Sequence, residues 1–168
     1  MISCGAISGL PTLPTLLALK DACIARMRAD GIEQWDAVYP DAAVLARDIT
    51  AGTLHDLREG DGIIACVTLD TTHDLLWQGM DWSAAGEPAA AVHRLMVHPT
   101  AQGRGLAKRL MTHAESLART QGFRAIHLDR FIANPAMLGL YERLGYRRTG
   151  TATMRKGPFV CFEKLLAL

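Results

Sequence analysis

The sequence predicts a single domain, residues 1–168, of mixed α and β structure in which helices cover both faces of a central sheet. The length of 168 residues fits one domain and suffices to bury a core without disulfides or metal. Hydrophobic residues make up 49% and charged residues 21%, which is typical of an ordinary globular chain. Segments with helical apolar spacing alternate with strand-like segments, which favours a layered α/β architecture.

The first half of the chain is predicted to contain a short strand, two helices and a hairpin. Gly31 is a suitable end for the first helix, and Asp41 is a suitable N-cap for the second. A polar turn at residues 60–62 separates two strand-like runs, as in a hairpin. The expected elements are a strand at 1–7, helices at 13–29 and 41–51, and strands at 53–57 and 62–69.

The second half is predicted to alternate strands and helices after an irregular stretch at residues 71–89. Asn134 and Pro135 are typical of the N-cap and first turn of a helix. Gly122 and Gly145 are suitable residues to end the two helices. The expected elements are strands at 90–97, 125–129, 146–151 and 159–164, and helices at 103–121 and 134–144.

Several classes of protein are disfavoured by composition. No apolar run approaches the roughly 20 residues of a membrane span, and the N-terminus lacks the pattern of a secretion signal. No set of His and Cys residues has zinc spacing, so we expect no metal. We expect reduced, mostly buried thiols in a cytoplasmic protein, because no CxxC pair occurs among Cys4, Cys23, Cys66 and Cys161.

Charge is unevenly distributed along the chain. Residues 1–93 carry a net charge of −8 and residues 94–168 a net charge of +9, within a total of +1. A basic half suits a polyanionic ligand and an acidic half suits a cationic one, although solvated surface charge could also segregate in this way. The basic half lacks interleaved aromatic residues and any nucleic-acid-binding motif, so we expect no nucleic-acid partner.

The most informative stretch, residues 95–107, is predicted to be a strand, a tight glycine-containing turn and the start of a helix. The N-terminus of a helix offers unpaired amide donors, and Gly103 and Gly105 allow the backbone to approach an anion closely. Arg104 and Lys108 add positive charge. The stretch therefore predicts a cradle for a pyrophosphate, with a plain glycine-rich connection as the alternative.

Two other nucleotide-binding motifs fail at this turn. The dinucleotide-binding fingerprint Gly-x-Gly-x-x-Gly would need a third glycine where Lys108 stands. A Walker loop would need four residues between its first glycine and Gly-Lys-Ser/Thr, and nothing in the stretch fits.

The same stretch resembles the GNAT family of N-acetyltransferases. The family's signature Gln/Arg-x-x-Gly-x-Gly/Ala is filled by Gln102, Gly105 and Ala107, and residues 94–99 are similar to the family's fourth strand. The resemblance extends over about residues 60–165. It implies a mixed, mostly antiparallel sheet of about six or seven strands with helices on both faces.

A second signature of the family follows in the expected order. Asn134 precedes Tyr141 by seven residues, and the helix ends in Leu-Gly-Tyr at 144–146. Residues 31–35 and 39–40 are similar to a bacterial subgroup of the family.

The resemblance implies acetyl-CoA as the cosubstrate. In the family, backbone groups of the fourth strand pair with the pantetheine arm, and amides of the loop hold the pyrophosphate. Asn134 contacts the CoA arm in the family, although a helix N-cap role can coexist with that contact. The residues expected to contact acetyl-CoA are Leu95, Met96, Val97, Gln102, Gly103, Arg104, Gly105, Leu106, Ala107, Lys108 and Asn134.

Tyr141 matches the family tyrosine that lies near the sulfur of CoA. A phenol can protonate the leaving thiolate after a neutral amine has attacked the thioester carbonyl, which is general acid catalysis. The alternative role for Tyr141 is an aromatic side chain packed in the core. The backbone amide of Val97 or a neighbour is a candidate donor to the oxyanion.

The general base is left open by the sequence. Many members of the family use a Glu on the fourth strand, and the matching position here is Ala91. His93 lies two residues further on the same side of the strand and has a suitable pKa range, although a strand histidine can also be purely structural. Glu33 and Asp81 are rivals, as is a chain of water molecules without a single essential residue.

The acceptor pocket implied by the resemblance involves acidic and aromatic residues. Acidic side chains would favour a cationic amine, and aromatic side chains could form its walls with cation–π contacts. Ordinary core packing is the alternative for each aromatic residue. The residues expected to contact the acceptor are Glu33, Trp35, Asp81 and Trp82.

The resulting prediction is a bacterial, cytoplasmic N-acetyltransferase. It would move the acetyl group of acetyl-CoA to a primary amine of a small molecule or peptide. The amine would attack the thioester directly, through a tetrahedral intermediate. Two alternatives stay open: a non-catalytic acyl-CoA sensor and an acyltransferase for a longer acyl-CoA. The family often dimerises, which makes a homodimer a candidate assembly. We expect no membrane partner.

Overall fold

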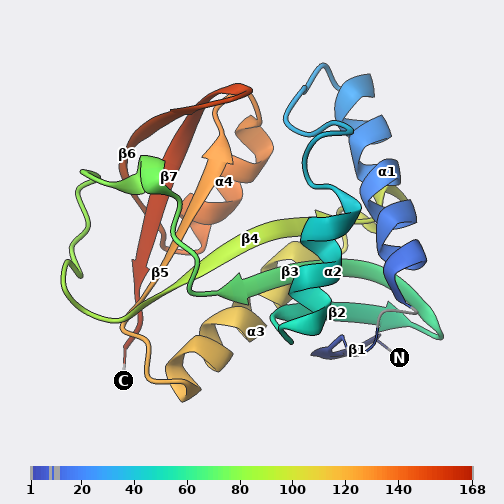
Figure 1. Ribbon diagram of the computed structural model, residues 1–168, viewed down its shortest axis with the longest axis horizontal. Helices are drawn as coiled ribbons and strands as arrows, with labels where there is room; N and C mark the ends of the chain where they lie inside the picture. The colour runs from blue at the N-terminus through green and yellow to red at the C-terminus, as the bar shows by residue number, and fades with distance from the viewer. Residues whose placement is uncertain (1, 8, 10–11, 168) are drawn as a thin grey trace. The chain divides into compact units, whose positions relative to one another are not determined.

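The computed structural model describes residues 2–7, 9 and 12–167, and within them it contains four α-helices and a seven-stranded sheet of order β1-β2-β3-β4-β5-β7-β6 (Figure 1). The strands are β1 (Ile2–Ala6), β2 (Leu54–Glu59), β3 (Gly62–Asp70), β4 (Ala89–Val97), β5 (Ala125–Phe131), β6 (Arg147–Met154) and β7 (Gly157–Leu165). The helices are α1 (Leu13–Ala29), α2 (Ala42–Thr50), α3 (Leu106–Thr120) and α4 (Pro135–Arg143), with short 3-10 helices η2 (Leu75–Trp77) and η3 (Pro99–Ala101).

The sheet is mixed and mostly antiparallel, which confirms the predicted fold class. Strand β4 pairs with β5 in parallel, whereas β1–β2, β2–β3, β5–β7 and β6–β7 pair antiparallel. The predicted order of strands and helices is also confirmed, while Met1 of the first expected strand lies outside the described residues.

The chain forms two compact units. The first unit comprises residues 1–69 and 94–112, and the second unit comprises residues 70–93 and 113–168. Strand β4 and helix α3 contribute residues to both units.

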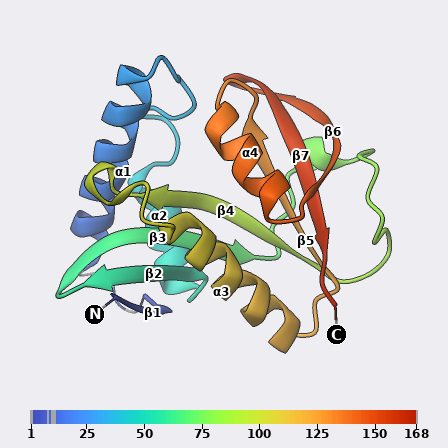
Figure 2. The ribbon, with the colours of Figure 1, turned by 180° about the vertical axis from the view of Figure 1, so that it is seen from behind.

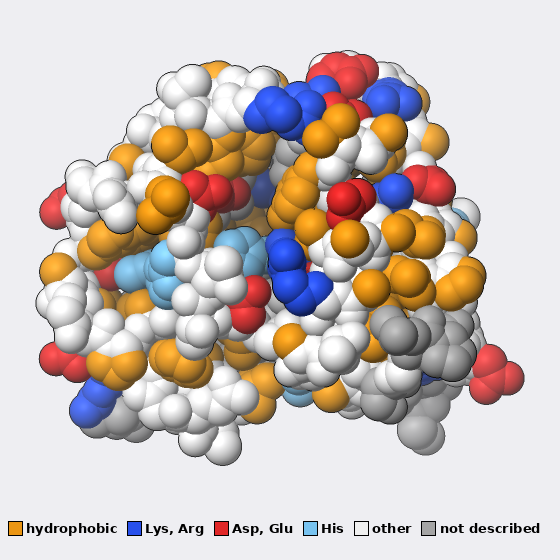
Figure 3. Space-filling view, in the orientation of Figure 1, with side chains coloured by type: hydrophobic (Ala, Val, Ile, Leu, Met, Phe, Trp, Pro, Cys, Tyr) orange, Lys and Arg blue, Asp and Glu red, His pale blue; other side chains and the backbone are white. Residues whose placement is uncertain are grey.

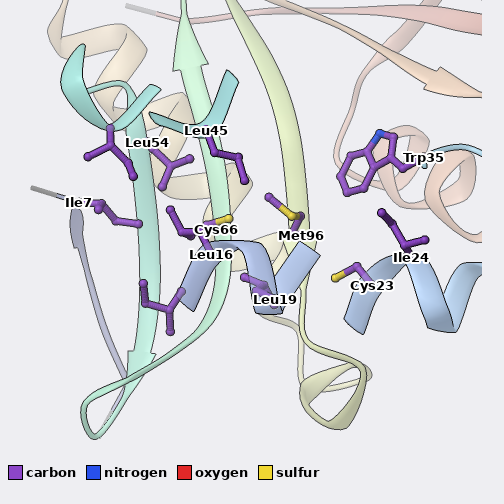
Figure 4. Close-up of a cluster of buried hydrophobic side chains, with 12 residues drawn as sticks. Ile7, Leu16, Leu19, Cys23, Ile24, Trp35, Leu45, Leu54, Cys66 and Met96 are labelled. Carbon is purple, nitrogen blue, oxygen red and sulfur yellow. The ribbon is translucent and has the colours of Figure 1, made fainter. Parts of the chain in front are cut away.

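In the first unit, α1 and α2 lie on one face of strands β2 and β3, and the beginning of α3 lies on the other (Figures 1 and 2). Buried α1 residues Leu16, Leu19 and Cys23 recur at helical spacing and pack into the core of this unit (Figure 4). Asp41 caps α2 as predicted, since its carboxylate accepts a 2.8 Å hydrogen bond from the Val44 amide.

In the second unit, β4, β5, β7 and β6 form one sheet surface with different cover on its two faces. Helix α4 lies on one face, and the segment that carries η2 lies on the other (Figures 1 and 2). A small hydrophobic cluster joins that segment to the sheet through Trp77, Ala91, Ala152 and Cys161. This irregular segment is therefore anchored to the sheet by a buried indole.

Helix α3 begins later than predicted. We expected it to start at residue 103, but it starts at Leu106 because Gly103 and Gly105 have φ angles of 77° and 75°, outside the helical region. Between β4 and this turn, Pro99–Ala101 forms the 3-10 helix η3, which the sequence analysis did not predict.

Candidate functional site

The glycine turn of the first unit has the local geometry of an anion cradle. A Cβ atom added at Gly103 or Gly105 would meet no heavy atom within 4 Å, so open space lies beside the backbone at both positions. The first turn of α3 follows directly, and its amide donors have no intrahelical acceptors. Leu106 is buried and anchors this end of the helix, whereas Gln102 and Lys108 are exposed. These residues fit the diphosphate of coenzyme A.

The positive charge of Arg104 at the cradle is partly neutralised by Glu59 at the end of β2. Arg104 donates two hydrogen bonds to the Glu59 carboxylate, at 2.7 Å and 3.2 Å, and both side chains are exposed. The arginine lowers the pKa of Glu59 through these hydrogen bonds and its charge. Lys108 remains an exposed cation on the first turn of α3.

The fourth strand carries the other predicted CoA contacts. Leu95 and Met96 bury their side chains, and Val97 is half-buried. The Val97 carbonyl oxygen accepts hydrogen bonds from Gln102 Nε2 at 3.3 Å and from Cys23 Sγ at 3.4 Å. The signature residue Gln102 therefore ties the turn back to the end of β4.

A backbone irregularity precedes these residues, which sequence reasoning missed. Arg94 has a φ angle of 51°, in the left-handed region, although it lies within β4. Its guanidinium is buried and donates to Asp48 Oδ2 at 2.6 Å and to the Tyr39 hydroxyl at 2.8 Å. Thr68 donates to the same Asp48 oxygen at 2.9 Å. This buried network links β4 to α2 and to the loop before it.

Tyr141 lies on α4 in the second unit, with 2% of its surface exposed. Its ring centroid is 5.7 Å from those of Tyr146 and Phe162. Burial raises the pKa of Tyr141. The charge of Asp129 raises it further, whereas the charge of Arg130 lowers it. The phenol is therefore protonated at neutral pH, as a general acid must be.

Asn134 forms the N-cap of α4. Its side-chain oxygen accepts a hydrogen bond of 3.4 Å from the Met137 amide, and the residue is buried. The N-cap role is confirmed, and a contact with the CoA arm stays a prediction.

His93 faces the segment that contains η2. Its Nε2 donates to the Thr72 carbonyl oxygen at 2.8 Å and lies 3.3 Å from Asp70 Oδ1. The imidazole stacks on the Trp77 indole with centroids 5.6 Å apart. With Nε2 as the donor, Nδ1 is the nitrogen left to accept a proton.

The four predicted acceptor residues fall in different units. Glu33 and Trp35 belong to the first unit, where Glu33 is exposed and Trp35 lies in the hydrophobic core with 6% exposure. Asp81 and Trp82 belong to the second unit. The exposed Asp81 carboxylate pairs with Arg147 at 2.8 Å. Core packing accounts for Trp35, and an acceptor contact for any of the four stays a prediction.

Trp82 and His127 form an aromatic pair on the sheet of the second unit. Their rings stack with centroids 3.9 Å apart. His127 Nε2 donates to Glu163 at 3.2 Å, and this carboxylate also accepts hydrogen bonds from the backbone amides of Ser83 and Ala84. Burial lowers the pKa of His127, so its imidazole is neutral at neutral pH.

Asp129 was not predicted as a site residue, yet it lies two residues from His127 on the same face of β5. Its Oδ2 accepts a 2.7 Å hydrogen bond from Trp77 Nε1. Burial raises the pKa of Asp129, which the indole hydrogen bond and the charge of His93 partly offset. The alternation of polar and apolar residues along β5 is the signal that could have found it.

Comparison with known proteins assigns the chain to a family. The model of the acetyltransferase (GNAT) family matches residues 19–146, so the chain belongs to this family. An acetyltransferase of Pectobacterium atrosepticum is 35% identical over 66 residues, which cover 39% of this chain and 47% of that protein. The chain thus matches about half the length of this curated relative.

Solved structures share the fold at low sequence identity. A GNAT-family acetyltransferase from Streptococcus agalactiae has a TM-score of 0.85 at 17% identity, covering 99% of this chain and 96% of that one. The ribosomal-protein-S18-alanine N-acetyltransferase of Escherichia coli has a TM-score of 0.71 at 15% identity, covering 100% and 96%.

Two other features are absent from the part of the chain that the structure describes. Among residues 2–7, 9 and 12–167, no group of three or more His, Cys, Asp or Glu side chains could hold a metal ion. No helix of the described chain is long and apolar enough to cross a membrane.

Proposed function

We propose that the chain is an N-acetyltransferase that moves the acetyl group of acetyl-CoA to a primary amine of a small molecule or peptide. One observation carries this proposal: both family signatures take up the local structures that the reaction needs. The first forms the open glycine turn before α3, and the second puts the protonated phenol of Tyr141 on α4.

The backbone amides around Gly103 and Gly105 would bind the pyrophosphate, and β4 would offer its backbone groups to the pantetheine arm. The β4–β5 ladder supports this role, because its paired residues on β4 are Ala89–Ala91 whereas β4 continues to Val97. Acetyl-CoA supplies an activated thioester when bound.

Tyr141 would donate its proton to the thiolate that leaves when the amine attacks through a tetrahedral intermediate. The phenol is protonated at neutral pH, which this role requires. A backbone amide near Val97 would stabilise the oxyanion. The identity of the acceptor, the preferred length of the acyl chain and the cytoplasmic location stay predictions.

A transfer assay tests this proposal. Purified protein is incubated with [14C]acetyl-CoA and a panel of amines that includes alkylamines, polyamines, amino acids and peptides with free N-termini. The proposal expects a labelled N-acetyl product with at least one member of the panel. Tight binding of coenzyme A without any product would instead support the acyl-CoA sensor.

A further inference from the structure

The segment between β3 and β4 is anchored to the sheet of the second unit at two places (Figures 1 and 2). One anchor is Trp77, whose Nε1 donates to Asp129 on β5 at 2.7 Å. The other anchor consists of residues 81–84, which are bonded to Glu163 on β7 and to Arg147 on β6. Different chemistry holds the two anchors, so they need not respond alike to a change in pH.

Glu163 is the centre of the second anchor. The residue is 2% exposed, and its carboxylate accepts hydrogen bonds from the Ser83 amide at 2.8 Å and the Ala84 amide at 3.0 Å. Arg147 reaches the same carboxylate at 3.5 Å and pairs with Asp81 at 2.8 Å. Burial alone would raise the pKa of Glu163, but the hydrogen bonds outweigh burial and lower it, so the group is ionised at neutral pH.

His127 completes this anchor from β5. Its Nε2 lies 3.2 Å from Glu163, and its ring stacks on that of Trp82 with centroids 3.9 Å apart. An ionised carboxylate can only accept, so Nε2 carries the proton and Nδ1 carries the lone pair. Nδ1 is buried and has no hydrogen-bond partner in the described part of the chain. A second proton would therefore place a charged donor without an acceptor in a buried site.

Two side chains of the segment lie against the His127 ring. Trp82 stacks on it, and His73 meets it edge-on with centroids 5.2 Å apart. His73 is exposed and Trp82 is half-buried, so the ring lies close to solvent on this side. Figure 3 shows histidine side chains beside hydrophobic ones at the surface of this unit. Displacement of Trp82 would let water reach a protonated imidazole.

We propose that His127 is the acid-sensitive part of a latch, formed with Glu163 and Arg147, that holds residues 81–84 on the sheet. At neutral pH the uncharged ring stacks under Trp82, and the latch is closed. In acid the ring binds a second proton that only the open latch can solvate, so residues 81–84 leave the sheet.

Opening of the latch would act on the acceptor amine. Asp81 and Trp82 are the predicted acceptor contacts of this unit, so their release would weaken binding of the amine without changing the glycine turn. This consequence alone rests on the proposed function, whereas the latch itself does not.

Other charged and titratable groups surround this site and enter its pH response. They are His73, Asp74 and Asp81 in the segment, His93 on β4, Asp129 on β5, Arg147 on β6 and Glu163 on β7. Asp129 acts in the direction opposite to His127, because burial raises its pKa and acid therefore favours its buried, protonated form. A protonated Asp129 can still accept the Trp77 hydrogen bond, so Trp77 should stay docked while residues 81–84 are released.

The pH range of opening follows from the titration of His127. Burial lowers the pKa of His127 in the closed latch, and in the open latch the ring regains the ordinary histidine pKa of about 6.5. The ratio of open to closed latch is therefore constant above about pH 7 and rises as the pH falls below about 6.5. At pH 5.5 the increase is at most about tenfold, since the ordinary pKa lies about one unit above that pH.

Hydrogen exchange of backbone amides, recorded by NMR at pH 7.5 and pH 5.5, tests the latch. The amides of Ser83 and Ala84 report on the Glu163 anchor, and the amide of Trp77, which donates to the Asp74 carbonyl oxygen at 3.0 Å, reports on the other. Rates are corrected for the intrinsic dependence of exchange on pH. In the wild type at pH 5.5, the protection of Ser83 and Ala84 should fall about three- to tenfold while that of Trp77 does not fall.

Two variants of His127 and one control isolate its role. His127→Phe keeps an aromatic ring that does not titrate, so the protection of Ser83 and Ala84 should be the same at both pH values. His127→Gln should give the same result with an amide that can still donate to Glu163, so the test does not depend on one variant. His113→Phe removes a histidine of α3 in the same unit and should respond like the wild type.

Three results would overturn the latch: no loss of protection in the wild type, an equal loss in the wild type and both His127 variants, or an equal loss at Trp77 and Ser83. In steady-state assays, the KM for the amine should rise more in the wild type than in His127→Phe as the pH falls to 5.5, while the KM for acetyl-CoA changes equally in both. Failure of the proposed function looks different. In that case the amides would respond as predicted, but the protein would neither bind coenzyme A nor transfer its acetyl group.

Discussion

The phenol of Tyr141 enters the reaction in its protonated form. An ordinary phenol, with a pKa of about 10, already holds its proton at neutral pH, and burial raises the pKa of Tyr141 further, so it can serve as an acid but not as a base. The contacts with Tyr146 and Phe162 hold the ring in position without using the hydroxyl. The proposed role of Tyr141 thus needs no ionisation before the reaction begins.

Replacing Tyr141 with Phe should lower kcat by about 10²- to 10⁴-fold while the affinity for acetyl-CoA changes little, because only the proton donor is lost. Steady-state kinetics and calorimetry measure the two quantities. Tyr146→Phe is the matched control, since Tyr146 is also a buried tyrosine and its ring centroid lies 5.7 Å from that of Tyr141. Wild-type turnover in Tyr141→Phe would remove this residue from the mechanism.

At the scale of elements, the buried ion pair between Arg94 and Asp48 connects β4 with α2. Both side chains are buried, and Thr68 and Tyr39 complete the network through hydrogen bonds. The pair secures a stretch of β4 whose backbone departs from regular strand geometry at Arg94. The ion pair with α2 therefore holds β4, the strand that would bind the pantetheine arm, in position.

Removing Asp48 should destabilise the protein by about 3–5 kcal/mol, because Arg94 would remain buried without its carboxylate partner. Urea denaturation of Asp48→Ala measures this change in the free energy of unfolding. The control is Glu59→Ala, which breaks the exposed ion pair with Arg104 and should have little effect. Equal stability of the two variants would show that the buried pair does not hold β4.

Elements defined by short-range signals were predictable from the sequence. The Asp41 and Asn134 caps, the hairpin and the glycine turn each depend on a few neighbouring residues, and the structure contains all four. The Trp77–Asp129 bond joins residues 52 positions apart, and no local pattern specifies such a contact. For the same reason the Arg94–Asp48 pair was missed.

At the scale of the whole molecule, protonation of His127 should reduce the stability as the pH drops below about 6.5, whereas the raised pKa values of Asp56 and Asp129 act in the opposite direction. Burial lowers the pKa of His127, so the unfolded chain binds a proton at a pH where the folded chain does not. Its contribution is fully present above the ordinary histidine pKa and is lost as the pH falls toward the folded value. The pKa of Glu163 is also lowered, since its backbone hydrogen bonds outweigh burial, which adds a further loss at more acidic pH.

Melting temperatures recorded from pH 8 to pH 5 test this expectation. Below about pH 6.5 the melting temperature of the wild type should fall relative to that of His127→Phe, because the phenyl ring of the variant does not titrate. Equal changes in melting temperature of the wild type and His127→Phe from pH 7 to pH 5 would contradict the assignment of a neutral, buried His127.

Family membership and the fold support acyl transfer, and the binding of coenzyme A at the glycine turn is the claim on which the rest depends. Isothermal titration of coenzyme A into the wild type and Gly105→Glu tests it most directly. We predict saturable heat with the wild type and none with the variant, whose carboxylate would occupy the cradle and repel the diphosphate. No heat with the wild type, or equal affinity in the two proteins, would contradict the account.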